Sequence, residues 1–304
     1  MRLLVSILCL ATLPAFAQQI VRTNDNFNFE YKVTIPPIKQ SGRIWIPLAR
    51  SDTHQTVVAK PDSPVKLKRL VESRFGNRIL FGKLHPQDSG KKITIRYRVN
   101  RRENTGTKQR GKLDEFLKTS RLVPLNSELK ELARKASAKG KNAEEKGNLL
   151  YWHTLDRMRY DKSGTGWGYG DAVYACDSRT GNCTDFHSYF IALARAEKIP
   201  ARFSIGFTIP AGQDEGKIGG YHCWAEFHAA DRWIPIDISE ADKHPALKDY
   251  YLGRHPANRF QLTQGRDLVA DPLPKSGPIN FLVYPVMEVD GEEVRAECSF
   301  RFQR

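Results

Sequence analysis

Short runs of alternating apolar and polar residues, separated by turn residues, dominate the first third of the chain. The clearest run places its apolar side chains on one face of a strand, at Ile93, Ile95, Tyr97 and Val99. Five earlier runs are bounded by glycine, proline or polar residues, at 27–35, 42–48, 54–60, 65–72 and 77–84. Short strands at this regular spacing, with no helical pattern between them, predict an antiparallel β-sandwich over residues 18–103.

The alternation stops after these strands. Residues 101–112 (RRENTGTKQRGK) have no periodicity and predict an interdomain linker, which we place at 104–123. Apolar residues then recur at helical spacing over 128–138 and 143–159. The second half of the chain therefore contains helices, unlike the first.

The end of the chain returns to a strand pattern. Two runs, 280–289 and 292–302, flank Asp290-Gly291, which is a strong signal for a tight hairpin turn. We assign this hairpin to a second domain over residues 124–304. A β-sandwich followed by a mixture of helices and strands gives a fold class of α+β.

One helical pattern carries a cysteine in its first turn. Gly181 and Asn182 end a loop, and apolar residues then recur every three or four positions until the chain reaches Pro200. Cys183 therefore lies at a helix N-terminus, where backbone N–H groups and the helix dipole favour a thiolate and lower the pKa of the thiol. Taken alone, this pattern also fits a buried structural cysteine or half of a disulfide.

A hairpin further along brings a histidine and an aspartate together. The strands 221–228 and 232–238 flank a tight turn at 229–231. A loop of two residues beginning at Ala229 places His222 opposite Asp237, and a loop of three residues places it one position away. A carboxylate there fixes the tautomer of the imidazole and stabilises its protonated form. With Cys183, these residues form a nucleophile, a base and an orienting acid.

Neighbouring residues leave other interpretations open. His187 follows Cys183 by four positions and shares its helix face, so it is either a rival base or a packed histidine. Trp224 and Glu226 share the strand face of His222 and either line the cleft or pack as a wall. Zinc is a further alternative, because several residues here are of zinc-ligand types: Cys176, Cys183, His187, His222 and Cys223. Since no Cys-x-x-Cys pair or standard ligand spacing occurs, we expect no metal and no cofactor.

Three segments, GNCTDFHSYFIALARAEKIPARFSIGF, GYHCWAEF and WIPIDISEAD, resemble the transglutaminase-like superfamily of papain-type cysteine enzymes. The resemblance covers roughly residues 124–242. It implies a helix bearing the nucleophile Cys183, packed on an antiparallel sheet that carries the base His222 and the acid Asp237. Many bacterial members join such a core to an N-terminal β domain in the cell envelope. No cluster of acids resembles the calcium sites of animal transglutaminases.

The resemblance also implies the chemistry. Members of the family transfer acyl groups of peptide or side-chain amides through a thioester, and bacterial members hydrolyse more often than they crosslink. The backbone N–H of Cys183 would contribute to the oxyanion hole. We take four aromatic residues as candidates for substrate binding: Trp167, Tyr169, Tyr221 and Trp224.

The remaining cysteines suggest a disulfide. Cys223 follows His222 directly and points to the opposite strand face, and Cys176 lies in the loop before the nucleophile. A Cys176–Cys223 disulfide would brace both catalytic elements and leave Cys183 free. We therefore predict this pairing.

Composition and the first residues bear on location. The 304 residues carry 48 lysines and arginines against 34 acids, a net charge of +14 that suits anionic surroundings. Residues 1–17, with Arg2, an apolar run and Ala15-Phe16-Ala17, predict a cleaved signal peptide and a secreted or periplasmic protein. No nucleic-acid-binding motif and no later membrane span occur, so the expected partner is a peptide or protein substrate, with an association with the cell envelope left open. A non-catalytic envelope interaction module remains the alternative function.

Overall fold

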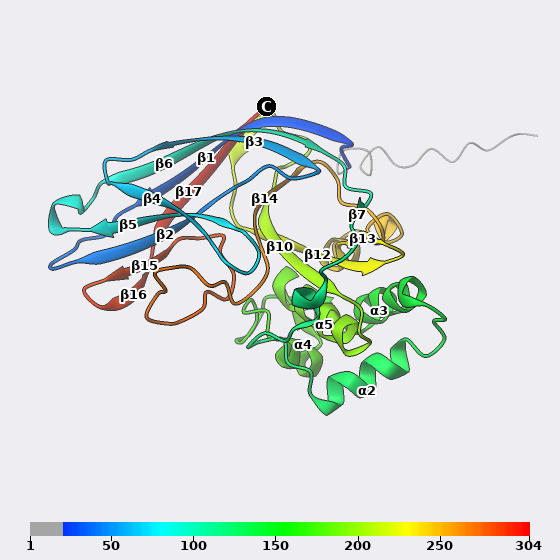
Figure 1. The fold of residues 1–304 in the computed structure, drawn as a ribbon. Helices are drawn as coiled ribbons and strands as arrows, with labels where there is room; N and C mark the ends of the chain where they lie inside the picture. The colour runs from blue at the N-terminus through cyan, green and yellow to red at the C-terminus, as the bar shows by residue number, and fades with distance from the viewer. Residues whose placement is uncertain (1–20) are drawn as a thin grey trace, which may run out of the picture.

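The computed structural model of the protein describes residues 21–304, so the predicted signal peptide lies outside the described residues. Three five-stranded sheets and five α-helices make up the fold, which is mixed α+β as predicted. Figure 1 shows two sheets on one side of the molecule, the helices on the other and the third sheet between them.

The first two sheets form the strand-rich N-terminal part. One has the strand order β11-β17-β1-β6-β3 and the other β16-β15-β2-β5-β4. The alternating residues of β6 (Lys92–Arg102) behave as predicted, because Ile93, Ile95, Tyr97 and Val99 are all buried. The other strands are β1 (Asn24–Thr34), β2 (Gly42–Leu48), β3 (Gln55–Asp62), β4 (Leu67–Val71), β5 (Arg78–Leu84), β11 (Glu215–Lys217), β15 (Val286–Val289), β16 (Glu292–Arg295) and β17 (Glu297–Gln303).

The C-terminal strands belong to these two sheets, and not to the separate second domain to which the sequence analysis assigned them. The Asp290-Gly291 turn forms the hairpin between β15 and β16, with φ of 53° and 95° at its two residues. However, β15 pairs with β2, and the chain then crosses to the other sheet, where β17 pairs with β1. The predicted strand 292–302 is therefore two strands, and both ends of the described chain lie in the same sandwich.

The third sheet has the order β14-β10-β12-β13-β7 and carries the helices. Its strands are β7 (Thr107–Lys108), β10 (Ala201–Thr208), β12 (His222–Ala229), β13 (Arg232–Ile236) and β14 (Arg259–Gln264). The helices are α2 (Ser127–Ala136), α3 (Ala143–Arg157), α4 (Ala172–Ser178), α5 (Cys183–Ala196) and α6 (Ile238–Lys243). Helix α5 packs on β12 and is enclosed by the other helices, and all its residues from Cys183 to Arg195 are buried. The helix is thus buried on all sides although it includes polar residues, among them Asp185, His187 and Arg195.

The short elements complete the chain. Strands β8 (Arg159–Tyr160) and β9 (Thr180–Gly181) pair in parallel just before α5. The 3₁₀ turns are η1 (Pro86–Asp88), η2 (Asp114–Leu117) and η3 (Pro245–Leu247). Among residues 21–304, no helix is both long enough and apolar enough to cross a membrane.

The sandwich and the third sheet share one hydrophobic core. Phe29 of β1 lies 5.0 Å, between ring centroids, from both Phe207 of β10 and Phe260 of β14. The predicted linker is part of this packing, because β7 pairs with β13 and Phe116 packs on Trp233 at 4.9 Å. The polar composition of 104–123 therefore reflects an exposed but ordered connection along the third sheet.

Candidate active site

Cys183 is the first residue of α5, at the helix N-terminus. The Asn182 side chain accepts a hydrogen bond from the Thr184 N–H at 2.8 Å, and Asp185 accepts one from the Asn182 N–H at 2.9 Å. This reciprocal arrangement is a capping box, which fixes where the helix begins. The sequence analysis placed Cys183 in this first turn, and its side chain is 2 % exposed.

Asp185 also fastens a glycine-rich loop to the start of α5. Its carboxylate accepts the N–H groups of Gly168 at 2.8 Å and Gly170 at 3.0 Å. Both glycines have positive φ, 90° and 67°, which a residue with a side chain adopts only with strain. The loop that contains Trp167 and Tyr169 is therefore held beside Cys183, the candidate nucleophile.

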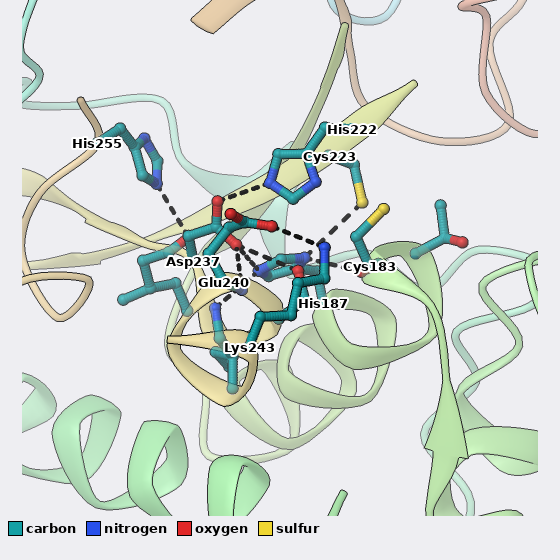
Figure 2. A network of polar contacts seen from close by, with 12 residues as sticks. Cys183, His187, His222, Cys223, Asp237, Glu240, Lys243 and His255 are labelled. Atoms are coloured by element: carbon teal, nitrogen blue, oxygen red, sulfur yellow. Dashed lines mark hydrogen bonds and ion pairs between the residues drawn. The ribbon is translucent and has the colours of Figure 1, made fainter. Parts of the chain in front are cut away.

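His222 and Asp237 are in direct contact, as Figure 2 shows: Nε2 of the imidazole lies 2.7 Å from Oδ2 of the carboxylate. The contact arises from a register that differs from the prediction. Ala229 pairs with Arg232 across a two-residue loop, Ala230-Asp231, in which both residues have positive φ.

This register changes how the two residues meet. The last paired residues are Ala225 and Ile236, so Asp237 lies one position beyond the ladder. There it caps α6 by accepting the Glu240 N–H at 3.1 Å. Continuing the register places Asp237 opposite Trp224, which makes His222 its diagonal neighbour on the same sheet face. The prediction of a shared face is therefore right, but the predicted direct pairing is wrong by two positions.

Asp237 is completely buried and receives several donors. Arg259 Nη2 donates to Oδ2 at 2.6 Å, and Ser239 Oγ donates to Oδ1 at 3.2 Å. Burial alone would raise the pKa of Asp237, but the positive charges of His222 and Arg259 outweigh it and hold that pKa well below its usual range. Sequence reasoning missed Arg259, because it arrives from β14 and nothing near it in the chain signals a partner.

The charges of Cys183 and His222 stabilise one another. Burial opposes protonation of the imidazole, but Asp237 outweighs it and raises the pKa of His222 to about 9. Burial likewise opposes the thiolate, yet interactions with Cys223 and His222 lower the pKa of Cys183 well below its usual range. Since Nε2 of His222 is occupied by Asp237, Nδ1 is the nitrogen that remains for Cys183. The site therefore favours a thiolate–imidazolium pair.

His187 is held as a neutral histidine. Its Nε2 accepts the Ile238 N–H at 3.1 Å, so its Nδ1 carries the proton and donates to the carbonyl of Cys183 at 2.8 Å. Burial lowers the pKa of His187, in keeping with this neutral form. Both ring nitrogens are thus occupied by backbone groups, and His187 joins α5 to α6. The packed-histidine interpretation holds, and the rival-base interpretation does not fit this geometry.

The predicted Cys176–Cys223 disulfide is absent, because all four cysteines of the described chain are free. Cys223 points toward α5, where its sulfur lies 3.7 Å from Nδ1 of His187 and beside Cys183 (Figure 2). Cys176 lies on α4, with its sulfur 3.8 Å from Glu128 Oε1 and 3.9 Å from Arg157 Nη2. The sulfurs of Cys176 and Cys223 therefore lie in different surroundings. The sequence before Cys183 does not show that Cys176 lies on a helix that turns it toward Glu128 and Arg157.

The predicted substrate-binding residues divide into two groups. The Tyr221 hydroxyl lies 3.0 Å from Asn182 Nδ2, next to the nucleophile, and Tyr169 is 65 % exposed on the adjoining loop with the half-buried Trp167. Trp224 is only 1 % exposed and packs behind the triad. Because its ring is enclosed by the protein, Trp224 cannot line a substrate cleft in this conformation.

Glu226 lies with Trp224 behind the triad, where its carboxylate accepts the Arg202 Nε–H at 2.5 Å. The packing interpretation therefore holds for this residue. In the described part of the chain, potential metal ligands converge at Glu128, Cys176 and Asp177, outside the triad. Two of these three side chains are exposed, and exposed acidic groups commonly gather without a metal.

Comparisons with known proteins place this geometry in context. The family model of the transglutaminase-like superfamily matches residues 130–238. An uncharacterized protein of Haemophilus influenzae is 30 % identical over a matched region that covers 60 % of this chain. The match spans 59 % of that relative's length.

Two solved structures are also similar. A candidate cysteine protease from Cytophaga hutchinsonii has a TM-score of 0.61 and 16 % identity, over 90 % of this chain and 91 % of its own. The periplasmic domain of TgpA from Pseudomonas aeruginosa, bound to ethylmercury, has a TM-score of 0.38 and 13 % identity, over 74 % of this chain and 92 % of its own. The first likeness shows a shared fold, and the second is too distant to support an argument.

Proposed function

We propose that this protein, in which residues 130–238 form a transglutaminase-like domain, is a cysteine-dependent acyl-transfer enzyme acting on peptide or side-chain amide bonds. The observation that carries the proposal is the buried chain of contacts from Arg259 through Asp237 to His222, with Cys183 at the helix N-terminus beside it. A surface histidine and a structural cysteine would not need a fully buried carboxylate and a second cation behind them.

The geometry supports a two-step reaction. The Cys183 thiolate attacks the amide carbon, and the imidazolium of His222 donates the proton of Nδ1 to the leaving amine, which leaves a thioester. Neutral His222 then removes a proton from water, and the resulting attack on the thioester restores the Cys183 thiolate. Asp237 keeps the imidazole oriented through both steps, and the Cys183 N–H at the helix N-terminus is suited to stabilise the oxyanion.

Hydrolysis is our choice over crosslinking. This choice rests on the family resemblance and on the description of the similar Cytophaga hutchinsonii protein as a candidate cysteine protease. We further propose export to the periplasm or the exterior, from the leader-like residues 1–17. The substrate would then be a peptide or protein in that compartment.

A non-catalytic envelope interaction module is the second candidate, and one observation favours it. Cys183 is 2 % exposed and His222 is 6 % exposed, so the thiol is nearly closed off from solvent in this conformation. A binding module could keep these residues for packing alone. The two functions differ in whether the thiol is ionised and reactive.

The first experiment measures alkylation of each cysteine of the protein against pH by mass spectrometry. We expect Cys183 alone to react readily near pH 6, because the pKa values of Cys176, Cys223 and Cys298 are all raised by burial. The His222→Ala variant should lose this reactivity, whereas His85→Ala, a change at an exposed histidine of the sandwich, should keep it. If Cys183 reacts only near pH 8–9 in the unaltered protein, the enzyme proposal fails and the interaction module leads.

Turnover is the second experiment. A panel of peptide amides and glutamine amides is incubated with the protein and with Cys183→Ala, and ammonia or amine release is measured. Release should fall by about tenfold at pH 10 relative to pH 7, since the imidazolium of His222 titrates at about 9. Incorporation of an added amine in place of hydrolysis would overturn our choice between the two reactions.

A further inference from the structure

A small polar cavity lies behind the triad, where the sandwich meets the third sheet. Its volume is about 160 Å³. At its outer end are the exposed residues Asp52 and Thr53, and at its inner end are the buried residues Arg101 and Glu226. Arg50, His54, Asn104, Thr107, Gln109, Arg202, Gln261 and Gln264 complete the lining. Cys183 and His222 do not line this cavity, so it is separate from the proposed active site.

Arg101 is the unusual residue of this cavity. It is 2 % exposed, and its one side-chain hydrogen bond is from Nη1 to Gln55 Oε1 at 2.8 Å. Its Nε is buried without a hydrogen-bond partner, and no carboxylate of residues 21–304 forms an ion pair with it. A guanidinium offers five N–H donors, and leaving buried donors of a cation without hydrogen-bond partners is costly. Asp52 and Glu226 act on the charge of Arg101 only from beyond hydrogen-bond distance. The cavity therefore contains a strong, unsatisfied donor.

The carboxylates that line the cavity are already engaged. Glu226 accepts from Arg202 at 2.5 Å and from Asn104 Nδ2 at 3.1 Å. Asp52 Oδ1 accepts the N–H groups of His54 at 2.7 Å and Gln55 at 2.9 Å. Neither acid is hydrogen-bonded to Arg101.

The balance of donors and charges therefore favours an anion. Arg50 makes one long hydrogen bond, 3.4 Å from Nη2 to the Phe75 carbonyl, and His54 Nδ1 is buried without a partner. Three arginines against two carboxylates leave one positive charge in the cavity. A ligand that supplies acceptors and negative charge would satisfy Arg101, Arg50 and His54 at once.

We propose that this cavity is a binding site for a small oxyanion, held between Arg101 and Arg50. The ligand class is an inorganic phosphate or sulfate, or a small carboxylate, because these groups present several acceptor oxygens to a guanidinium. The cavity is the right order of size for such an ion, with a volume of about 160 Å³.

The site connects parts of the molecule that are far apart in sequence. Arg101 belongs to β6 of the sandwich, and Glu226 belongs to β12, which also carries His222. The ring of Trp224 lies 5.8 Å from the guanidinium of Arg101 and 5.8 Å from that of Arg259, which bonds Asp237. A bound oxyanion would therefore neutralise Arg101 next to Trp224, whose ring is also next to Arg259. It would also strengthen the contact between the sandwich and the third sheet.

The test is thermal unfolding of the full chain with inorganic phosphate or acetate, at an ionic strength held constant with sodium chloride. A ligand at ten times its dissociation constant should raise Tm by about 2 °C, and the rise should follow the logarithm of ligand concentration. The Arg101→Gln and Arg50→Gln variants should lose this rise. Arg98→Gln removes the same charge from an exposed position of β6 and should retain it. Circular dichroism checks that each variant is folded.

Each outcome decides the proposal. A saturable rise that disappears in both Arg101→Gln and Arg50→Gln but persists in Arg98→Gln supports the site. A response to phosphate alone would assign the tetrahedral ions, and a response to acetate as well would assign carboxylates too. If phosphate and acetate do no more than sodium chloride, or act equally on Arg101→Gln, the cavity holds water and the proposal is wrong. None of these results depends on Cys183, so a failure here leaves the proposed function untouched.

Discussion

Asp237 is the residue on which the site depends most. It binds His222 and Arg259 through one oxygen, and Ser239 and the Glu240 N–H through the other. An aspartate at an N-cap is common. Here the same carboxylate also orients an imidazole, so the start of α6 and the tautomer of His222 are fixed together.

His187 provides a prediction at this scale. The His187→Asn variant loses the contacts that join Cys183 O to the Ile238 N–H, so we expect a loss of about 1–3 kcal/mol in the free energy of unfolding. The alkylation of Cys183 near pH 6 should persist, because the thiolate is stabilised by His222. Urea unfolding and alkylation mass spectrometry measure the two effects.

The comparison is with His222→Ala, which should abolish the low-pH alkylation of Cys183. A folded His187→Asn protein that also loses this alkylation would make His187 the base. It would thereby contradict the assignment of His187 as a neutral link between two helices.

Residue patterns predicted Cys183, His222 and Asp237, because a helix N-terminus and a short hairpin are local features. They could not predict Arg259 or the neutral form of His187, since both depend on partners supplied by other elements. The wrong disulfide has the same origin. Alternation along the strand says that Cys223 and His222 point apart, but not that α5 fills the space beyond Cys223.

At the scale of elements, β14 is held unusually close to β10. The register shifts between Ile205 and Gly206, and a Cβ at Gly206 would lie 1.8 Å from the carbonyl oxygen of Phe260. Phe260 follows Arg259 directly, so this close approach sets the position of the guanidinium that bonds Asp237. The absence of a side chain at Gly206 therefore allows β14 to place Arg259 within hydrogen-bond distance of Asp237.

Gly206→Ala should move β14 and weaken the contact between Arg259 and Asp237. We expect a loss of about 1–3 kcal/mol or more in the free energy of unfolding, as for other overpacked sites. The pH profile of Cys183 alkylation should change as well, because Arg259 acts on both Asp237 and His222. Gly219→Ala is the matched control, since a Cβ there meets nothing within 4 Å.

Equal stability and an unchanged alkylation profile in Gly206→Ala and Gly219→Ala would show that β14 does not position Arg259. The sequence does not predict this role of Gly206. A glycine in a strand indicates a bulge or a close approach of another segment, but it does not identify that segment as β14.

At the scale of the whole molecule, the first and last strands of the described residues, β1 and β17, pair with each other. Strand β17 lies between β1 and β11, and it contributes Phe300 and Phe302 to the core at 6 % and 3 % exposure. Arg304 then forms an ion pair with the buried Asp25 at 2.8 Å. The sequence analysis predicted strand structure here, but it joined β16 and β17 into one strand and assigned it to the wrong region. Strand patterns do not specify partners distant in sequence.

Removal of residues 297–304 should therefore unfold the sandwich. Burial of the two phenylalanines contributes about 3–6 kcal/mol, a large part of a typical stability of about 5–15 kcal/mol. The shortened chain also exposes the edge of β1, which favours aggregation. Solubility and thermal unfolding are the measurements.

Ser299→Ala, a change at an outward position of β17, should behave like the unaltered protein and serves as the control. A shortened protein that remains soluble with an unchanged Tm would show that β17 is dispensable. The closure of the sandwich by both ends of the chain would then contribute little to its stability.

The position of β17 also has a consequence for synthesis. The cysteine, histidine and aspartate of the proposed site leave the ribosome before β17 does, but the sandwich that packs on their sheet gains β17 only when that strand emerges. A nascent chain that stops short of β17 would carry all three side chains of the proposed site beside a sandwich that lacks this strand. The residues of the proposed site are therefore present in the nascent chain before the sandwich that packs on their sheet can be completed.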